Sequence, residues 1–338
     1  MKDKAFEYNY RFIKKTVPEM RYDEKTSFDK WQTAARKKLY ELLGLEFFEK
    51  CNDDFSILST EKKDEYTKIR FTFQTEPGLY IPCVMLLPET TEKRPVMICL
   101  QGHSTGMHNS FGEEIFEQDK EFNSRTPDRA IANEAAKRGY IAIAMEQRYM
   151  GELGGSDDGE PSCVKGNSLS ALLVGRCTVG ERVWDVSRLI DVIEKHIPGA
   201  DSDNISCIGG SGGGTTTFYA ACIDERIKMA LPNVAICTFS DSIAAMHHCG
   251  CNYIPGIARY FDMGDLGGLI APRKLLVSSG KEDPIFPING ARECAKIIDW
   301  LYKCAKADGK FIFLEGNGGH QSFTTEIFRK LKEGNFAK

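Results

Sequence analysis

Hydrophobic positions along the chain alternate between two periodicities, that of a helix and that of a buried strand. After position 95, short apolar runs are separated by longer stretches in which apolar residues recur every three or four positions. The strand-like runs are 96–100, 140–145, 205–208, 229–234, 274–278 and 311–314. The helical stretches are 128–138, 179–196, a segment from 212, 289–307 and 321–332. This alternation predicts an α/β fold with a mostly parallel central sheet flanked by helices.

The chain before position 95 has a different pattern, in which two strand-like segments are joined by a tight turn. Residues 66–74 alternate between apolar and polar positions, and 79–87 form a second strand-like run. Pro77 and Gly78 lie between them and favour a turn. We expect an antiparallel N-terminal hairpin at one edge of the sheet.

The same patterns suggest how the chain is organised. Apolar residues at helical spacing within 28–48 predict an early helix, so we expect a helical extension over 1–62 that packs on a main domain over 63–338. Two long stretches, about 147–177 and 236–272, interrupt the regular alternation. Long unpatterned segments in a compact domain are commonly lids or binding loops, so we predict lid-like insertions there.

Composition narrows the class of protein. The chain has 338 residues and a formal net charge of −4, which argues against a nucleic-acid partner because such proteins usually present a basic face. No run reaches the roughly 18 apolar residues of a membrane span, and the first ten residues lack the apolar core of a signal peptide. We therefore expect a cytoplasmic protein whose twelve cysteines are mostly reduced thiols in the core.

The segment that carries a chemical signal is Gly209-Gly210-Ser211-Gly212-Gly213. It follows a predicted strand, opens a predicted helix and fits the pattern G-x-S-x-G of a nucleophile elbow. A turn this sharp needs neighbours almost without side chains, and it lifts the serine hydroxyl clear of the sheet. The P-loop alternative lacks its Lys-Ser/Thr pair. Ser211 is the predicted nucleophile.

A nucleophilic serine needs a base and an acid that orients the base. His247, His248 and His320 follow Ser211, and His320 lies in a Gly-rich loop after the last predicted strand. The order Ser, acid, His that belongs to this type of elbow favours His320, because Asp283 in Gly-Lys-Glu-Asp-Pro lies between the two. Glu282, next to Asp283, is the competing acid.

Two main-chain N–H groups are needed to stabilise an oxyanion. One candidate is the amide of Gly212, directly after the nucleophile. The other is the amide of His103, in the Gln-Gly-His-Ser-Thr-Gly loop 101–106 after the strand at 96–100. The imidazole of His103 can either face the substrate or pack against the protein.

With these segments identified, the chain resembles the α/β-hydrolase superfamily, and within it the dienelactone-hydrolase-like and acetyl xylan esterase-like branch. The resemblance covers about 66–332 and depends on five motifs. They are Gln-Gly-His-Ser-Thr-Gly at 101–106, Glu-Gln-Arg-Tyr-Met-Gly at 146–151, Gly-Gly-Ser-Gly-Gly at 209–213, Gly-Lys-Glu-Asp-Pro-Ile-Phe-Pro at 280–287 and Gly-Gly-His at 318–320. It implies the α/β-hydrolase fold and an esterase that acts on small, short-acyl esters.

The expected activity is that of a serine hydrolase that cleaves carboxylic esters through an acyl-enzyme intermediate. The alternatives are a peptidase of the prolyl-oligopeptidase type and a hydrolase-fold lyase. We expect a small-molecule ester as the partner, no cofactor, no nucleic-acid or membrane partner, and a possible homo-oligomer. The segment His247-His248-Cys249-Gly250-Cys251 has no distant ligand pair with finger-like spacing, so no metal is expected.

Overall fold

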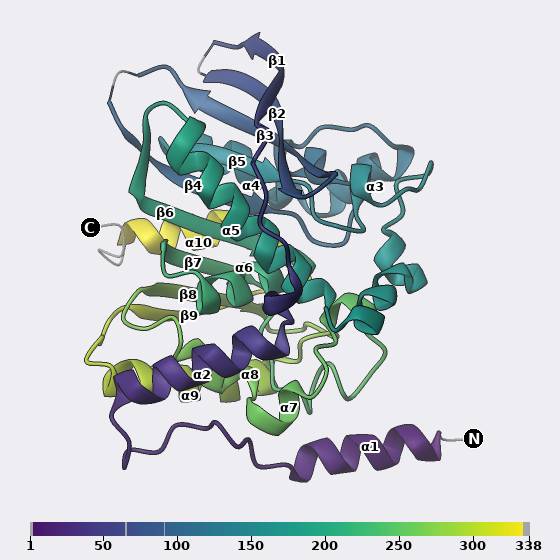
Figure 1. The fold of residues 1–338 in the computed structure, drawn as a ribbon, viewed down its shortest axis with the longest axis vertical. Coiled ribbons are helices and arrows are strands. Elements are labelled where there is room, and N and C mark those ends of the chain that lie inside the picture. The colour runs from purple at the N-terminus through teal and green to yellow at the C-terminus, as the bar shows by residue number, and fades with distance from the viewer. Residues whose placement is uncertain (1–2, 65, 91, 334–338) are drawn as a thin grey trace.

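The computed structural model describes residues 3–64, 66–90 and 92–333 of the chain. In this part of the chain nine strands form one sheet, in the order β1-β2-β3-β5-β4-β6-β7-β8-β9 (Figure 1). The strands are β1 Ser56–Lys62, β2 Tyr66–Glu76, β3 Leu79–Pro88, β4 Arg94–Leu100, β5 Ile141–Met145, β6 Ala200–Gly210, β7 Ile227–Asn233, β8 Lys274–Gly280 and β9 Phe311–Gly316. The strands from β5 to β9 along this order pair in parallel, which confirms the predicted mostly parallel α/β sheet.

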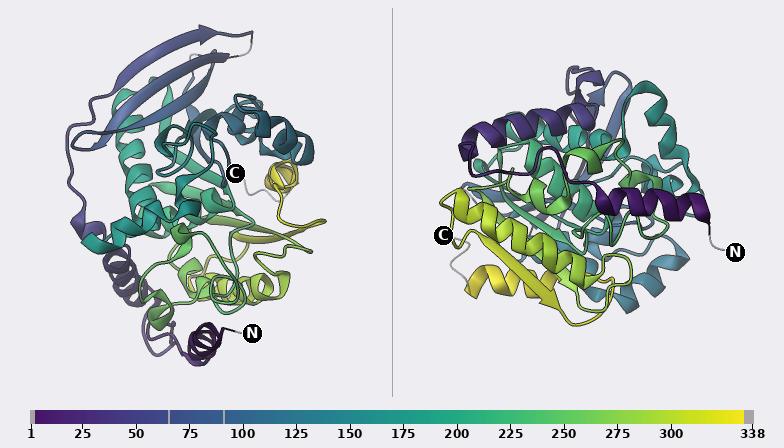
Figure 2. Two further views of the ribbon diagram at one scale, coloured as in Figure 1. Left: turned by 90° about the vertical axis from the view of Figure 1, so that its right-hand side faces the viewer. Right: turned by 90° about the horizontal axis from the view of Figure 1, so that it is seen from below.

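Helices cover both faces of the sheet (Figures 1 and 2). The α-helices are α1 Lys4–Lys15, α2 Phe28–Leu42, α3 Glu117–Arg125, α4 Ile131–Ala136, α5 Thr178–His196, α6 Gly212–Ile223, α7 Ile257–Tyr260, α8 Met263–Gly267, α9 Ile288–Cys304 and α10 Thr324–Glu333. Successive residues of β4 enter different hydrophobic clusters: Val96 and Ile98 pack with α5 and α6, whereas Met97 and Cys99 pack with α4 and α10. A strand buried on both faces has no polar alternation, which explains the continuous apolar run in the sequence.

The predicted N-terminal hairpin is present. β2 and β3 pair antiparallel around the turn at Pro77 and Gly78, and β3 pairs antiparallel with β5 at the start of the parallel sheet. One further strand, β1, pairs antiparallel with β2 although it lies in the segment expected to be helical. All seven residues of β1 are exposed, so the strand carries no buried apolar face that a sequence pattern could indicate.

The N-terminal segment reaches the main body of the protein mainly through α2. Trp31, Ala35 and Leu39 form its buried face, whereas α1 has no buried residue. The indole N–H of Trp31 donates to the carbonyl of Met20 at 2.7 Å. Gln32 donates from its side-chain amide to the carbonyls of Gly268 and Ala271, at 2.9 and 2.6 Å. The two contacts of Gln32 tie α2 to the segment that precedes β8.

The two predicted insertions are built mostly from 3₁₀ turns and short helices. The first contains η4 Gly151–Leu153, η5 Ser162–Lys165 and η6 Asn167–Val174, and the second contains η7 Gly250–Asn252, α7 and α8. The turns η5 and η6 both contact η7, so the two insertions meet although they are about 80 residues apart in sequence. Within the described residues, no helix has the length and apolar character that crossing a membrane requires.

Candidate active site

Ser211 lies at the sharp turn between β6 and α6 and has φ 50° and ψ −118°, a conformation that is rare for a residue with a side chain. The flanking positions 209 and 213 must be glycine because there is no room for a side chain. A Cβ on Gly209 would come within 2.3 Å of the Gly213 carbonyl oxygen, and one on Gly213 within 2.2 Å of the Leu100 carbonyl oxygen. The amide of Ser211 donates to the Asn233 carbonyl at 2.9 Å, which holds the turn against β7.

The structure brings Ser211, His320 and Asp283 together, in the order predicted from the sequence. His320 Nε2 lies 2.8 Å from Ser211 Oγ, and His320 Nδ1 lies 2.8 Å from Asp283 Oδ2. The other carboxylate oxygen, Oδ1, accepts from the amides of Ile285 and Phe286 at 2.8 and 2.9 Å. Asp283 is buried, whereas the competing acid Glu282 is exposed. The geometry therefore favours Asp283 as the acid that orients His320.

Aromatic packing holds the imidazole of His320 in place. The ring of Phe286 stacks on His320 with a centroid distance of 5.8 Å, and His248 contacts the same Phe286 edge-to-face at 5.5 Å. Ser242 donates its hydroxyl hydrogen to the Ile285 carbonyl, so it accepts from His248 Nε2, which lies 3.1 Å away. Burial, followed by repulsion from His320, lowers the pKa of His248 to about 4, so His248 is a neutral hydrogen-bond donor at neutral pH.

The two predicted oxyanion donors lie beside the nucleophile. Gly212 is the first residue of α6, where main-chain N–H groups have no acceptor within the helix. The loop after β4 approaches so closely that a Cβ on Gly102 would lie 3.2 Å from Ser211 Cβ. Among the described residues, neither the His103 amide nor the Gly212 amide has a main-chain or side-chain acceptor. Both N–H groups are therefore free to bind a developing oxyanion.

Two residues that were not predicted from the sequence as part of the site support this loop. Glu146, which follows β5, accepts from the Gln101 side-chain amide at 2.5 Å and from the Met107 amide at 3.2 Å. Gln147 donates to the Gln101 carbonyl at 2.6 Å and accepts from Thr216 of α6 at 2.8 Å. Burial raises the pKa of Glu146 to about 8. The signal was present in the quoted Glu-Gln-Arg-Tyr motif, but only the fold shows what the first two residues hold.

The third residue of that motif has a structural role. Arg148 is buried, and its guanidinium donates two hydrogen bonds of 2.8 Å to Asp185 on α5. It also forms an ion pair with Glu76 at the end of β2, at 3.0 Å. Because these partners belong to different elements, Arg148 ties the segment after β5 to the sheet and to α5.

Ser211 and His320 open into a cavity of about 500 Å³. Its walls come from the oxyanion loop, the segment around α3 and η3 (Pro127–Arg129), both insertions and the loop of His320. Arg129 is the one permanently charged residue among the described residues that line this cavity. Its guanidinium lies 4.6 Å from the ring centre of Phe122, and it forms no ion pair with any described carboxylate. The cavity thus combines a reactive serine with an unpaired cation.

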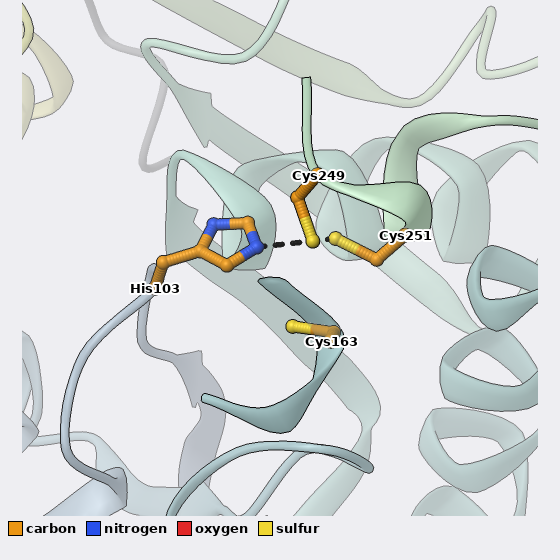
Figure 3. A group of neighbouring side chains, drawn as sticks. All are labelled: His103, Cys163, Cys249 and Cys251. Atoms are coloured by element: carbon orange, nitrogen blue, oxygen red, sulfur yellow. Dashed lines mark hydrogen bonds between the residues drawn. The ribbon is translucent and has the colours of Figure 1, made fainter. Parts of the chain in front are cut away.

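The imidazole of His103 points away from the loop toward three cysteines. His103 Nε2 lies 3.1 Å from Cys251 Sγ, and the ligand atoms of His103, Cys163, Cys249 and Cys251 all lie within 4.8 Å of one another (Figure 3). Hydrogen bonds from Cys249 and Cys251 lower the pKa of the Cys163 thiol. These four side chains are the group of described residues that could hold a metal ion, whereas His247 and His248 do not belong to it.

Comparison with known proteins places the chain among hydrolases. The model of the Abhydrolase family matches residues 9–298. YtaP of Bacillus subtilis (strain 168), provisionally named a hydrolase, is 24% identical over 300 residues, which cover 87% of this chain and 95% of YtaP.

Solved structures show the same fold. A protein of Bacteroides fragilis NCTC 9343, provisionally named an acetyl xylan esterase, superposes with a TM-score of 0.78 at 17% identity over 92% of this chain and 82% of that one. A glucuronoyl esterase from Solibacter usitatus superposes with a TM-score of 0.68 at 15% identity, over 95% of this chain and 98% of that one.

Proposed function

The chain belongs to the Abhydrolase family, and from this premise we propose that it is a serine esterase that cleaves carboxylic esters through an acyl-enzyme intermediate. The observation that carries the proposal is the continuous hydrogen-bonded series from Ser211 Oγ through His320 to Asp283, with both contacts at 2.8 Å. A serine paired with an oriented base is the arrangement that acyl transfer requires.

In the proposed reaction His320 Nε2 takes the hydroxyl proton as Ser211 Oγ attacks the ester carbonyl. Asp283 stabilises the imidazolium that forms and keeps Nδ1 protonated. The amides of Gly212 and His103 bind the oxyanion of the tetrahedral intermediate. His320 then protonates the leaving alcohol, and a water molecule activated by the same imidazole releases the acid from Ser211.

The site also suggests a class of substrate. The cavity of about 500 Å³ falls in the size range of sites for small molecules, and both insertions contribute to its lining. Two of the structural neighbours are named as an acetyl xylan esterase and a glucuronoyl esterase, which supports esters of carbohydrates. We therefore favour small esters with short acyl groups. All twelve cysteines are free thiols, which supports a cytoplasmic location.

The test is hydrolysis of p-nitrophenyl acetate, butyrate and octanoate by the wild type, Ser211→Ala and His320→Ala. Ser56→Ala is the matched control because that serine is exposed on the edge strand β1, which contributes no described residue to the cavity. We expect both triad variants to lose nearly all activity and the control to retain it, with all four proteins showing the same circular dichroism spectrum. Activity that survives in Ser211→Ala would contradict the proposal. Wild-type protein that cleaves peptides but none of these esters would favour the peptidase alternative.

A further inference from the structure

Three segments that are far apart in sequence bring one imidazole and three thiols to a common point beside the oxyanion loop (Figure 3). His103 comes from the loop after β4, Cys163 from η5 of the first insertion, and Cys249 and Cys251 from the start of η7 in the second insertion. We propose that these four side chains bind one Zn²⁺ ion.

The ligand set and its geometry match a structural zinc site. Three cysteines and one histidine form a closed tetrahedral set, and Zn–S bonds of about 2.3 Å would place the ligand atoms about 3.8 Å apart. The four ligand atoms already lie within 4.8 Å of one another, so small side-chain rotations close the tetrahedron. Cys163 and Cys251 are buried, and Cys249 and His103 are half-buried, which leaves little room for a water ligand.

A buried positive charge next to the cluster supports a bound anion there. Arg182 on α5 is 2% exposed, and among the described residues it forms no ion pair with a carboxylate. Its guanidinium donates to the Arg148 carbonyl at 2.8 Å and to Cys163 Sγ at 3.7 Å. One Zn²⁺ with three thiolates and a neutral imidazole has a net charge of −1. The proposed site therefore provides the opposite charge that a buried arginine needs.

A disulfide explains the same residues less completely. A bond between two of the cysteines would leave the third thiol unpaired, would give His103 no partner of its own and would remove the negative charge beside Arg182. None of these three cysteines is in a disulfide, so each can supply a thiolate to zinc. The experiments below distinguish a disulfide from a zinc site.

The position of the site indicates what the zinc does. The main-chain N–H of His103 is the proposed oxyanion donor, and its ring lies against Gly212, where a Cβ would come within 3.0 Å of His103 Cε1. Zinc bound to Nε2 would hold this loop against both insertions, which form walls of the cavity. With four protein ligands the ion has no open position for substrate, so we expect it to position the loop and the insertions.

The test is metal analysis of protein purified under reducing conditions without a metal-affinity tag. We expect one zinc per chain in the wild type and in Cys304→Ser, a control cysteine at the end of α9 that is remote from the site. Cys163→Ser, Cys249→Ser and Cys251→Ser should each lose the metal. Arg182→Met should bind zinc about 10–100-fold more weakly, as is typical when a residue that supports metal ligands is lost.

A second measurement does not depend on whether the variants fold. Wild-type protein stripped of metal and loaded with Co²⁺ should show a sulfur-to-cobalt charge-transfer band and the strong visible bands of a tetrahedral site. The proposal would be overturned if wild-type protein retained no zinc after reconstitution with Zn²⁺ and showed no such bands. It would also be overturned if the intact mass, measured under reducing conditions, were two hydrogens lower than that of the fully reduced chain, because that difference indicates a disulfide. Neither readout uses an ester, so a missing esterase activity would leave this test unaffected.

Discussion

Asp283 divides its two carboxylate oxygens between His320 and the main chain: Oδ2 lies 2.8 Å from His320 Nδ1, while Oδ1 accepts from the amides of Ile285 and Phe286. The two amides set the orientation of the carboxylate, so Oδ2 always faces the imidazole. The consequence is that His320 carries its hydrogen on Nδ1, which leaves Nε2 as the acceptor for the hydroxyl of Ser211.

Asp283→Asn should therefore inactivate the enzyme without unfolding it. The asparagine oxygen will stay with the two amides, and the NH₂ group will face His320 Nδ1. His320 must then carry its hydrogen on Nε2 and can no longer accept the Ser211 proton. We expect kcat for p-nitrophenyl acetate to fall by roughly 10⁴-fold, as in other triads, with little change in the melting temperature. Retention of more than about a tenth of the activity would show that the acid is another residue.

The glycines of the elbow should differ sharply in their tolerance of alanine. A Cβ on Gly213 would lie 2.2 Å from the Leu100 carbonyl oxygen, whereas one on Gly210 meets no atom within 4 Å. Gly213→Ala should lower the free energy of unfolding by about 1–3 kcal/mol or more and reduce activity. Gly210→Ala should leave stability unchanged or raise it by up to about 1 kcal/mol. Urea denaturation of both variants provides the comparison, and equal losses would contradict this account of the turn.

Glu146 should make the stability of the protein depend on pH. Burial raises its pKa to about 8 in the folded state from an ordinary value of 4.5, so the folded state binds a proton more tightly than the unfolded state does. This contribution is fully present below about pH 4.5 and is lost progressively as the pH rises to about 8. Glu146→Gln cannot ionise and should show a flatter dependence of unfolding free energy on pH across this window.

The matched control for this prediction is Glu114→Gln, because Glu114 is exposed. Its pH profile should follow that of the wild type. Identical profiles for wild type and Glu146→Gln, measured by urea denaturation at several pH values, would show that Glu146 is ionised in the folded state across the whole window.

Arg129 should favour esters that carry a carboxylate. It is a cation on the wall of the cavity and has no ion pair with a described residue. Arg129→Met keeps an apolar side chain against Phe122 but removes the charge. A charged hydrogen bond contributes about 1.5–3 kcal/mol, so kcat/KM for a p-nitrophenyl hemisuccinate should fall about 10–100-fold. The value for the neutral acetate should change little, and an equal fall for both substrates would contradict a role in binding the carboxylate.

Much of the fold of this protein can be predicted from local sequence patterns. The continuous apolar run at 96–100 predicts β4 because a strand buried on both faces needs hydrophobic residues at successive positions. The glycines around Ser211 predict the elbow because their spacing is visible within five consecutive residues, although the Leu100 carbonyl that leaves no room at Gly213 belongs to β4. By contrast, β1 could not be predicted, since an exposed edge strand buries no apolar side chain.

The candidate site also has one part that local sequence predicts and another that only the tertiary structure shows. The spacing and order of Ser211, Asp283 and His320 indicated a triad because each lies in a short motif at the end of a predicted strand, and the carboxyl ends of parallel strands meet at one edge of the sheet. No local pattern joins His103 and Cys163 to Cys249 and Cys251, or Glu146 to Gln101. Those contacts depend on how the loops and insertions fold over the sheet, and packing between segments about 45–150 residues apart is decided only in the tertiary structure.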